Sequence, residues 1–442
     1  MSERRADLVI EARWVLPVEP EDAVLEHHGV VIDGGRIAAV LPAGEVDAAF
    51  APAERLSLAD HVLIPGLVNL HTHAAMSLLR GLADDRALMT WLQEHIWPAE
   101  MQHVSPEFVY DGTLLACAEM LRGGVTCAND MYFFPESAAR AFLDAGMRAS
   151  LGLIAIDFPS AYAADADDYL RRGLECRDRL GNEDRLSFCM APHAPYTVGD
   201  DTFRRVATLA EELDLPVHVH LHETAGEVTA SVAAHGCRPL ERLRRLGLLT
   251  ERLIAVHAVH LDRTEIAALA RSGASVAHCP SSNLKLASGF APVGELLAHG
   301  VNVGLGTDGA ASNNRLDVMQ EMRTAALLAK AVAGDAEAMP AHRALRCATL
   351  GGARALGLER RIGSIVPGKA ADLTAVSLAS PETRPCFDPA SHLAYACGRE
   401  HVTDVWVGGE RVVRDRALAR PEFRSLERRA SLWHNRLRRK SA

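Results

Sequence analysis

Two histidines separated by one residue, His71 and His73, end the apolar run "PGLVNLHTH". On a β-strand alternate side chains share one face, so the two imidazoles would point the same way, about 7 Å apart along the strand. Such a pair could bind one metal ion, and it could equally be the polar end of a strand. Other chemical groups in the chain must decide between these two interpretations.

Further histidines and carboxylates end later apolar runs. They are His193 in "APHAPY", His220 and Glu223 in "VHVHLHETAGE", His257 in "AVHAVH" and Asp308 in "GLGTDGAASNN". If these runs are neighbouring strands of one barrel, their carboxyl ends bring these groups to one point. Three histidines and one aspartate make a zinc-type donor set with room for a water molecule. The convergence favours the ligand interpretation of His71 and His73.

The neighbours of these groups suggest their roles. Glu223 follows His220 by three residues, so it can reach a water at such a site without being a ligand, as a proton carrier must. Asp308 lies in Gly-Thr-Asp-Gly, where it is either a ligand beside the water or a turn-forming residue. His218 shares a face with His220 but lies one layer deeper, which predicts a core residue.

The elements that must position these groups are eight apolar runs, most of them followed by a segment of helical period. The runs lie at Val62–His73, Val125–Asp130, Arg148–Ile156, Leu186–His193, Val217–His222, Leu253–His257, Ser275–Cys279 and Val301–Asp308. One helical segment, "SPEFVYDGTLLACAEMLRGG", has Ser-Pro at its start and Gly-Gly at its end. The pattern predicts a (β/α)₈ TIM barrel over residues 62–365. An open doubly wound sheet is the alternative, but no Gly-x-Gly-x-x-Gly turn follows the first run.

The two ends of the chain resemble each other in kind. Each has two β-type runs joined by a Gly-Gly turn, in "HHGVVIDGGRIAAV" and in "HVTDVWVGGERVVRD". A small sheet cannot bury its own face, so we expect residues 1–61 and 366–442 to form one composite β-sandwich domain beside the barrel. The Arg-rich end "RSLERRASLWHNRLRRKSA" predicts a solvated or subunit-packing helix.

The chain contains an ordered set of motifs: "PGLVNLHTHAAMSLLRGLADD", "WPAE", "GGVTCANDMYF", "APHAPYT", "HVHLHETAGEV", "AVHAVHLD", "HCPSSNLKLASG" and "VGLGTDGAASNN". In these motifs the chain resembles the amidohydrolase superfamily and, within it, the deaminases of 5'-methylthioadenosine and S-adenosylhomocysteine. The motifs span Pro65 to Asn314, and "VPGKAADL" extends the likeness past the barrel.

The resemblance implies one Zn²⁺ per subunit. Its ligands would be three imidazoles and one carboxylate: His71, His73, His220 and Asp308. Relatives with two metal ions bridge them with a carboxylated lysine at the end of the fourth strand, and this chain has no lysine before Lys285. One metal ion is therefore expected, and Fe²⁺ or Mn²⁺ could replace zinc on the same donors.

The resemblance also implies a hydrolytic deaminase that converts an adenosine derivative to its inosine analogue and ammonia. Glu223 would carry a proton from the attacking water to the purine ring nitrogen, while Asp308 accepts a proton and His257 hydrogen-bonds the water. Glu100, in "WPAE", would accept the ribose hydroxyls. His193 would bind a nucleoside edge or a ribose oxygen.

The sequence leaves alternatives open for the substrate and for the function. A deaminase or chlorohydrolase of guanine, a pterin or an s-triazine would have the same metal site, and a metal-free assembly protein of this fold is a remote alternative. The segment "RASLGLIAIDFPSAYAAD" holds only Arg148, early in the third strand, so it offers no clamp for the carboxylate of S-adenosylhomocysteine. The methylthio compound is favoured, although a neighbouring subunit could supply an arginine.

Composition limits the partners. A formal charge of -10 argues against a general nucleic-acid binder, and no apolar run reaches transmembrane length, so no membrane partner is expected. Nine scattered cysteines, and a start that lacks the apolar core of a signal peptide, predict a cytoplasmic protein. The expected partner is a small nucleoside substrate, and the resemblance implies a homodimer or higher homo-oligomer.

Overall fold

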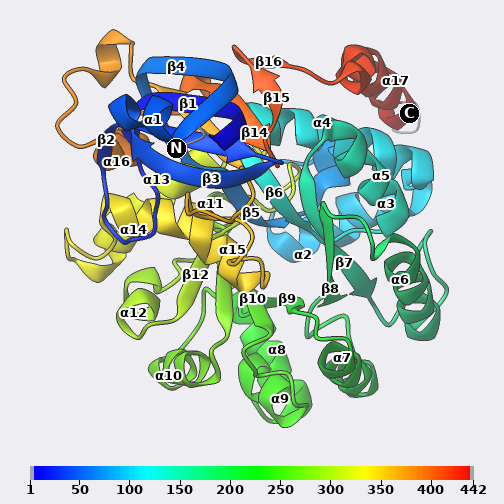
Figure 1. Ribbon diagram of the computed structural model, residues 1–442. Coiled ribbons are helices and arrows are strands. Elements are labelled where there is room, and N and C mark those ends of the chain that lie inside the picture. The colour runs from blue at the N-terminus through cyan, green and yellow to red at the C-terminus, as the bar shows by residue number, and fades with distance from the viewer. Residues whose placement is uncertain (1–3, 439–442) are drawn as a thin grey trace.

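Eight parallel strands form a nearly closed barrel in the computed structural model, which describes residues 4–438 (Figure 1). In order around the barrel they are β5 (Leu67–Thr72), β6 (Val125–Asp130), β7 (Arg148–Ala155), β8 (Leu186–Pro192), β9 (Val217–Leu221), β10 (Leu253–His257), β11 (Ser275–His278) and β12 (Asn302–Leu305). The predicted TIM barrel is confirmed, and each of the eight apolar runs supplies one of its strands.

Backbone and side-chain hydrogen bonds join the end of the last barrel strand to the first strand. The amide of Asp308, just past β12, donates to the carbonyl oxygen of His71 at 2.9 Å. Asn69 on β5 accepts from the amide of Thr307 at 3.0 Å and donates to the Thr307 hydroxyl at 2.8 Å. These bonds bring Asp308 beside the two histidines of the first strand.

Helices surround the barrel. They are η2 (Ala74–Leu79), α2 (Leu88–Thr90), η3 (Trp91–Ile96), α3 (Trp97–His103), α4 (Pro106–Arg122), α5 (Pro135–Ala145), α6 (Ala166–Leu180), α7 (Asp200–Glu212), α8 (Ala225–His235), α9 (Pro239–Arg245), α10 (Arg263–Ser272), α11 (Pro280–Lys285), α12 (Val293–Ala298), α13 (Val318–Ala333), α14 (Ala341–Arg346), η4 (Cys347–Gly351) and α15 (Gly352–Ala355). The predicted helix α4 is confirmed: Ser105 caps it by accepting from the amide of Phe108, and Gly123 follows its last turn. None of the helices within residues 4–438 is both long and apolar enough to cross a membrane.

The first predicted barrel strand, Val62–His73, is in fact divided between two sheets. Val62–Pro65 ends β4 (Phe50–Pro65) and pairs with β13 (Leu373–Ser377) in the sheet of the chain ends, and β5 begins only at Leu67. Between them lies Gly66, where an added Cβ would come within 2.1 Å of the Thr126 hydroxyl. The apolar run is continuous because both of its halves are buried, so hydrophobicity could not reveal the change of sheet.

The chain ends together form one mixed sheet of eight strands, which lies apart from the barrel strands (Figure 1). Its order is β16 (Ala417–Leu418), β15 (Glu410–Arg414), β14 (Val402–Val407), β13, β4, β1 (Arg4–Val15), β2 (Leu25–Asp33) and β3 (Arg36–Pro42). Between its strands come η1 (Ala43–Glu45), α1 (Val46–Ala49), η5 (Pro381–Thr383), α16 (Pro389–Tyr395) and η6 (Arg399–His401). Ile10, Ile32 and Trp406 share one core, so the two ends of the chain bury each other's apolar faces.

The two predicted hairpins are confirmed, and their turns meet. Gly35 and Gly409 have φ of +73° and +78°, which a side chain would strain. An added Cβ at Gly35 would lie 2.5 Å from the carbonyl oxygen of Gly408. Ala371 donates to Gly35 and accepts from Gly409, so it fastens one turn to the other.

The Arg-rich segment folds as α17 (Leu426–Arg438), preceded by η7 (Pro421–Ser425). Trp433 is buried against α4, where its indole N–H donates to Asp111 at 2.9 Å and its ring meets Phe108 edge-on. Figure 1 shows this red helix beside α4. The helix thus packs on the barrel of its own chain.

Candidate metal centre and substrate pocket

Imidazoles from three strands converge at the carboxyl end of the barrel. His71 comes from β5 and His73 directly follows it, His220 comes from β9 and His257 from β10, and Asp308 follows β12. Ligand-type atoms of His71, His220 and His257 lie within 4.8 Å of one another, as do those of His71, His73 and Asp308. The strand ends therefore bring together the groups that the sequence placed there.

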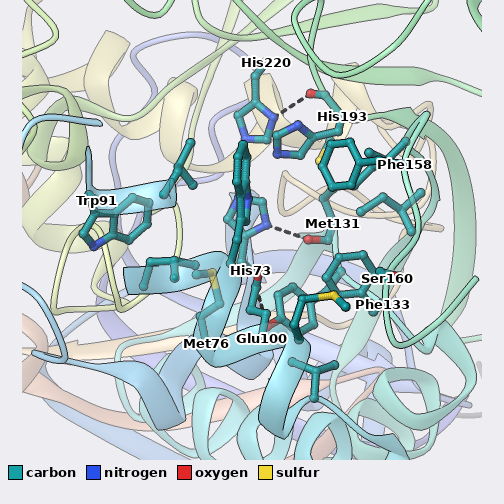
Figure 2. Close-up of a pocket in the computed structure, with 18 of the residues that line it drawn as sticks. His73, Met76, Trp91, Glu100, Met131, Phe133, Phe158, Ser160, His193 and His220 are labelled. Carbon is teal, nitrogen blue, oxygen red and sulfur yellow. Dashed lines mark hydrogen bonds between the residues drawn. The ribbon is translucent and has the colours of Figure 1, made fainter. Parts of the chain in front are cut away.

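The Nδ1 atoms of three of these imidazoles are engaged with oxygen acceptors. His73 donates to the carbonyl oxygen of Met131 at 2.6 Å and His220 to that of His193 at 2.7 Å (Figure 2). His257 donates to the side-chain oxygen of Asn283 at 2.8 Å. A proton on Nδ1 leaves the Nε2 lone pair free to face the centre, as a metal ligand requires.

His71 is the fourth imidazole at this centre. Its Nδ1 lies 3.0 Å from Nε2 of His218, while its own Nε2 is buried without a hydrogen-bond partner and lies 3.3 Å from Asp308 Oδ1. Burial lowers the pKa of His71 to about 4, so the ring is neutral and can donate a lone pair. The prediction that His218 is a core residue is confirmed, and it also orients His71.

The geometry of Asp308 suits both roles that its motif allows. Its φ of +61° makes it a left-handed turn residue, while its carboxylate points back to the histidines. Oδ2 accepts from Ser282 at 2.6 Å and from Ser312 at 2.7 Å, and Oδ1 accepts from the amide of Gly309 at 2.8 Å. Burial alone would raise the pKa of Asp308, but the contact with His71 and the other neighbouring imidazoles hold it well below its usual range, so the group is an anion.

This donor set fits a divalent transition metal. Imidazole nitrogens and carboxylate oxygens are the ligands that zinc takes in catalytic sites. The orphaned Nε2 of His71 is costly in an apolar interior, and a metal ion would satisfy it. The hydrogen bonds on the far side of each ring fix its orientation before any metal binds.

Glu223 faces the same centre from the end of β9. It is buried and its Oε2 lies 3.8 Å from Nε2 of His257. Burial raises the pKa of Glu223, which makes a proton easier to hold on it at neutral pH. A carboxyl group in this state can both accept and return a proton.

A pocket of about 940 Å³, its open mouth included, lies over these groups (Figure 2). Its walls are largely apolar and come from the segment Leu88–Val104, from Met131–Phe133 and from residues 154–161. Trp97 and Phe158 meet edge to face with ring centres 5.7 Å apart. No lysine or arginine among residues 4–438 lines this pocket.

One carboxylate lies in the apolar wall. Glu100, on α3, accepts a hydrogen bond from the hydroxyl of Tyr132 at 2.7 Å. The surrounding apolar side chains keep water from its charge and raise its pKa to about 7. Its second oxygen is available to hydroxyl groups in the pocket.

His193, just past β8, presents an acceptor. Its Nδ1 lies 2.9 Å from the hydroxyl of Thr197, which itself donates to the carbonyl oxygen of Ala194. Nδ1 therefore carries the proton and Nε2 does not. Burial lowers the pKa of His193 to about 3, so this Nε2 stays an acceptor at neutral pH.

Every residue that the sequence singled out lies in this pocket or directly behind it. His71 is the one behind it, and the others line the wall: His73, Glu100, His193, His220, Glu223, His257 and Asp308. Sequence reasoning missed the side chains that hold them, namely Tyr132, Asn283, Ser282 and Ser312. These four lie inside the motifs "NDMYF", "SSN" and "AASNN", but nothing in their spacing says which ligand each would contact.

A barrel with this centre at its carboxyl end defines a class of metal-dependent hydrolase, and comparison with known proteins agrees. A model of the amidohydrolase family matches residues 62–412. The chain belongs to the amidohydrolase family.

Individual relatives are similar over nearly the whole chain. A 5-methylthioadenosine/S-adenosylhomocysteine deaminase from Saccharophagus degradans is 46% identical over 428 residues, which cover 97% of this chain and 96% of the relative. The crystal structure of an adenosine deaminase from Xanthomonas campestris, with bound zinc, is 53% identical with a TM-score of 0.97, over 99% of this chain and 100% of that one. An atrazine chlorohydrolase from Arthrobacter aurescens, at 22% identity and a TM-score of 0.89 over 96% and 99% of the two chains, shares the fold.

Proposed function

We propose that this protein is a zinc-dependent hydrolytic deaminase that converts 5'-methylthioadenosine to its inosine analogue and ammonia, with adenosine and S-adenosylhomocysteine as further candidate substrates. The observation that carries the proposal is the set of imidazole lone pairs that converge with Asp308 and Glu223 at the base of one pocket. The relatives named as deaminases of adenosine derivatives support it.

In this proposal one Zn²⁺ is held by His71, His73, His220 and Asp308, and Fe²⁺ or Mn²⁺ would suit the same donors. When bound, the ion supplies Lewis-acid polarisation of a water molecule. The residues of the chain orient that water: Asp308 accepts one of its protons and His257, whose Nε2 faces the centre, hydrogen-bonds it.

Glu223 and Asp308 then move the protons that deamination needs. Glu223 passes one proton of the water to the ring nitrogen beside C6 as the water oxygen bonds to that carbon. The proton that Asp308 accepts goes to the amino group, and the C–N bond to that group then breaks. One water is consumed and one ammonia is released. Burial of Glu223, which raises its pKa, supports a role in which it must be protonated at neutral pH.

The walls of the pocket bind the rest of the nucleoside. Glu100, fixed by Tyr132, accepts the ribose hydroxyls, and Nε2 of His193 accepts from a further nucleoside group. The apolar stretch at Phe158 and Pro159, and a lining without lysine or arginine among the described residues, favour a methylthio group over a charged homocysteine chain.

We further propose that the enzyme works in the cytoplasm as a homodimer or a higher homo-oligomer. The nine cysteines are all free thiols, which supports a reducing compartment. The mass of the purified protein in solution tests the oligomeric state.

The experiment that tests the reaction is an ultraviolet scan of the zinc-loaded protein with methylthioadenosine, S-adenosylhomocysteine, adenosine, guanine and atrazine in parallel. Conversion of an adenine spectrum to a hypoxanthine spectrum is expected, fastest with methylthioadenosine. Turnover of guanine alone would remove the ribose role of Glu100. Turnover of atrazine alone, or of nothing in a protein confirmed to hold zinc, would remove the nucleoside proposal.

A further inference from the structure

The backbone turns abnormally between His220 and Glu223. Along β9, His218, His220 and His222 should share the inner face, and Glu223 should point outward to the helices. Instead His222 has a φ of +56°, and the strand has already ended at Leu221. The left-handed residue reverses the alternation, so that Glu223 lines the pocket while His222 lies outside it, beside Glu265.

This turn is held at every polar backbone atom of His222. Its carbonyl oxygen accepts from the amides of Val259 at 3.0 Å and His260 at 2.9 Å. Its amide donates to Oε1 of Glu227 at 2.9 Å, and the amide of Glu223 donates to Oε2 of the same carboxylate at 2.8 Å. The Glu227 carboxylate therefore accepts hydrogen bonds from two consecutive backbone amides, one on each of its oxygens.

We propose that Glu227 is a positioning residue that directs the Glu223 carboxyl group at the reacting atoms. The inference rests on the role proposed above for Glu223. Glu227 does not touch the substrate: it acts through the backbone, because a left-handed non-glycine residue persists only where its surroundings enforce it. The two hydrogen bonds to the buried Glu227 carboxylate enforce the left-handed backbone at His222, the residue that turns Glu223 inward.

A carboxylate suits this task better than an amide. Both of its oxygens accept, whereas a glutamine would turn an NH₂ group toward one of the two backbone N–H donors. Glu227 is also the fourth residue of "TAGE", in which Thr224 caps α8 by accepting from the amide of Glu227 at 3.1 Å. The cap thus serves the helix through Thr224 and the active site through Glu227.

The test is a double-mutant cycle of Glu227→Gln and Glu223→Gln in the full-length, zinc-loaded protein, with methylthioadenosine as substrate. Glu227→Gln alone should lower kcat by about 10- to 100-fold, as the loss of an orienting partner does, with KM and zinc content close to those of the parent. In the Glu223→Gln background the same change should cause no further loss, because the group it positions no longer carries a proton.

Thr224→Ala separates positioning from support of the helix. It removes the cap of α8 but leaves both amide bonds of Glu227, so the melting temperature should fall while kcat stays. If Glu227→Gln failed to fold, Glu227→Asp, which keeps the charge but withdraws it by one methylene, would replace it with the same expected loss of kcat.

Two outcomes would overturn the inference: a parental kcat in Glu227→Gln, or losses that multiply in the double mutant. Full activity of Glu223→Gln would instead remove the proposed role of Glu223 itself. The failure of the positioning role and the failure of the mechanism are therefore distinguishable.

Discussion

The floor and the roof of the pocket are built in opposite ways. The floor, formed by His71, His73, His220, His257 and Asp308, comes from strand ends, and a hydrogen bond to a second group holds each of its side chains. The roof, formed by the three wall segments Leu88–Val104, Met131–Phe133 and residues 154–161, comes from short helices and loops with mostly apolar contacts. One polar pair, Glu100 with Tyr132, interrupts its apolar surface.

This contrast suggests different functions for the floor and the roof. Fixed donors at strand ends suit chemistry, because misplaced groups lose transition-state stabilisation. A roof of loosely specified apolar contacts suits selection among substrates that share one base and differ at the 5' end. Changes in the floor should therefore reduce kcat on every substrate, and changes in the roof should alter KM or the preference between substrates.

The largest effect is expected at the base of the pocket. Glu223→Gln removes the proposed proton carrier but none of the proposed metal ligands, so kcat should fall by at least ~10²–10⁴-fold while the zinc content stays. Metal analysis and initial rates on methylthioadenosine measure both. Glu241→Gln is the matched control, because Glu241 pairs with Arg244 and Arg245 on α9, away from the pocket. A wild-type rate in Glu223→Gln would contradict the assignment.

A smaller effect, in KM, is expected for the polar group of the roof. In the proposed binding mode the ribose hydroxyls donate to the charged Glu100. Glu100→Gln should weaken these hydrogen bonds and lower kcat/KM by about 10- to 100-fold. Glu94→Gln, at an exposed position of η3, is its control.

The same group predicts a pH dependence. The pKa of Glu100 is raised to about 7, so the carboxylate is present above that pH and is lost as the pH falls through it. The kcat/KM of the parent should therefore fall on the acid side of pH 7, and KM should rise. Rates from pH 5 to 9 measure this acid limb. Its persistence near pH 7 in Glu100→Gln would assign it to another group.

The floor could be predicted from the sequence because the barrel itself creates it. Parallel strands of a barrel meet at their carboxyl ends, so His71, His220 and Asp308 needed only to lie near the ends of their runs. The roof could not be predicted in this way. Tyr132 contacts Glu100 across 32 residues of chain, and the contact depends on how α3 crosses the mouth.

Two local features could not be predicted from the sequence, and both have physical causes. Strand alternation alone would turn His222 inward and Glu223 outward, and the left-handed backbone of His222 reverses this. The apolar run at Val62–Pro65 predicts a barrel strand, whereas close packing at Gly66 marks the passage from one sheet to the other. In both cases the backbone departs from a regular period at a single residue, which hydrophobicity does not report.

The apolar part of the roof should control the choice between 5' groups. Phe158→Arg would place a guanidinium at the partly exposed rim, where it could pair with the carboxylate of S-adenosylhomocysteine. The ratio of kcat/KM for S-adenosylhomocysteine to that for methylthioadenosine should rise about tenfold. Val232→Arg, an exposed apolar position on α8 outside the pocket lining, is the control. An unchanged ratio would mean that the 5' group does not reach Phe158.

The smallest effect is expected where the roof most resembles the floor, at the hydrogen bond from Tyr132 to Glu100. Tyr132→Phe keeps the ring in the wall but removes one oriented donor, so KM for methylthioadenosine should rise about fivefold with little change in kcat. Because that hydrogen bond lowers the pKa of Glu100, its loss should also move the acid limb of kcat/KM to higher pH. Tyr110→Phe, which removes a hydrogen bond of equal length to Asp144 outside the pocket, should change neither. A limb that stayed in place while KM rose would mean that Tyr132 contacts the nucleoside itself, and the roof would then contain a second polar contact to the substrate beside Glu100.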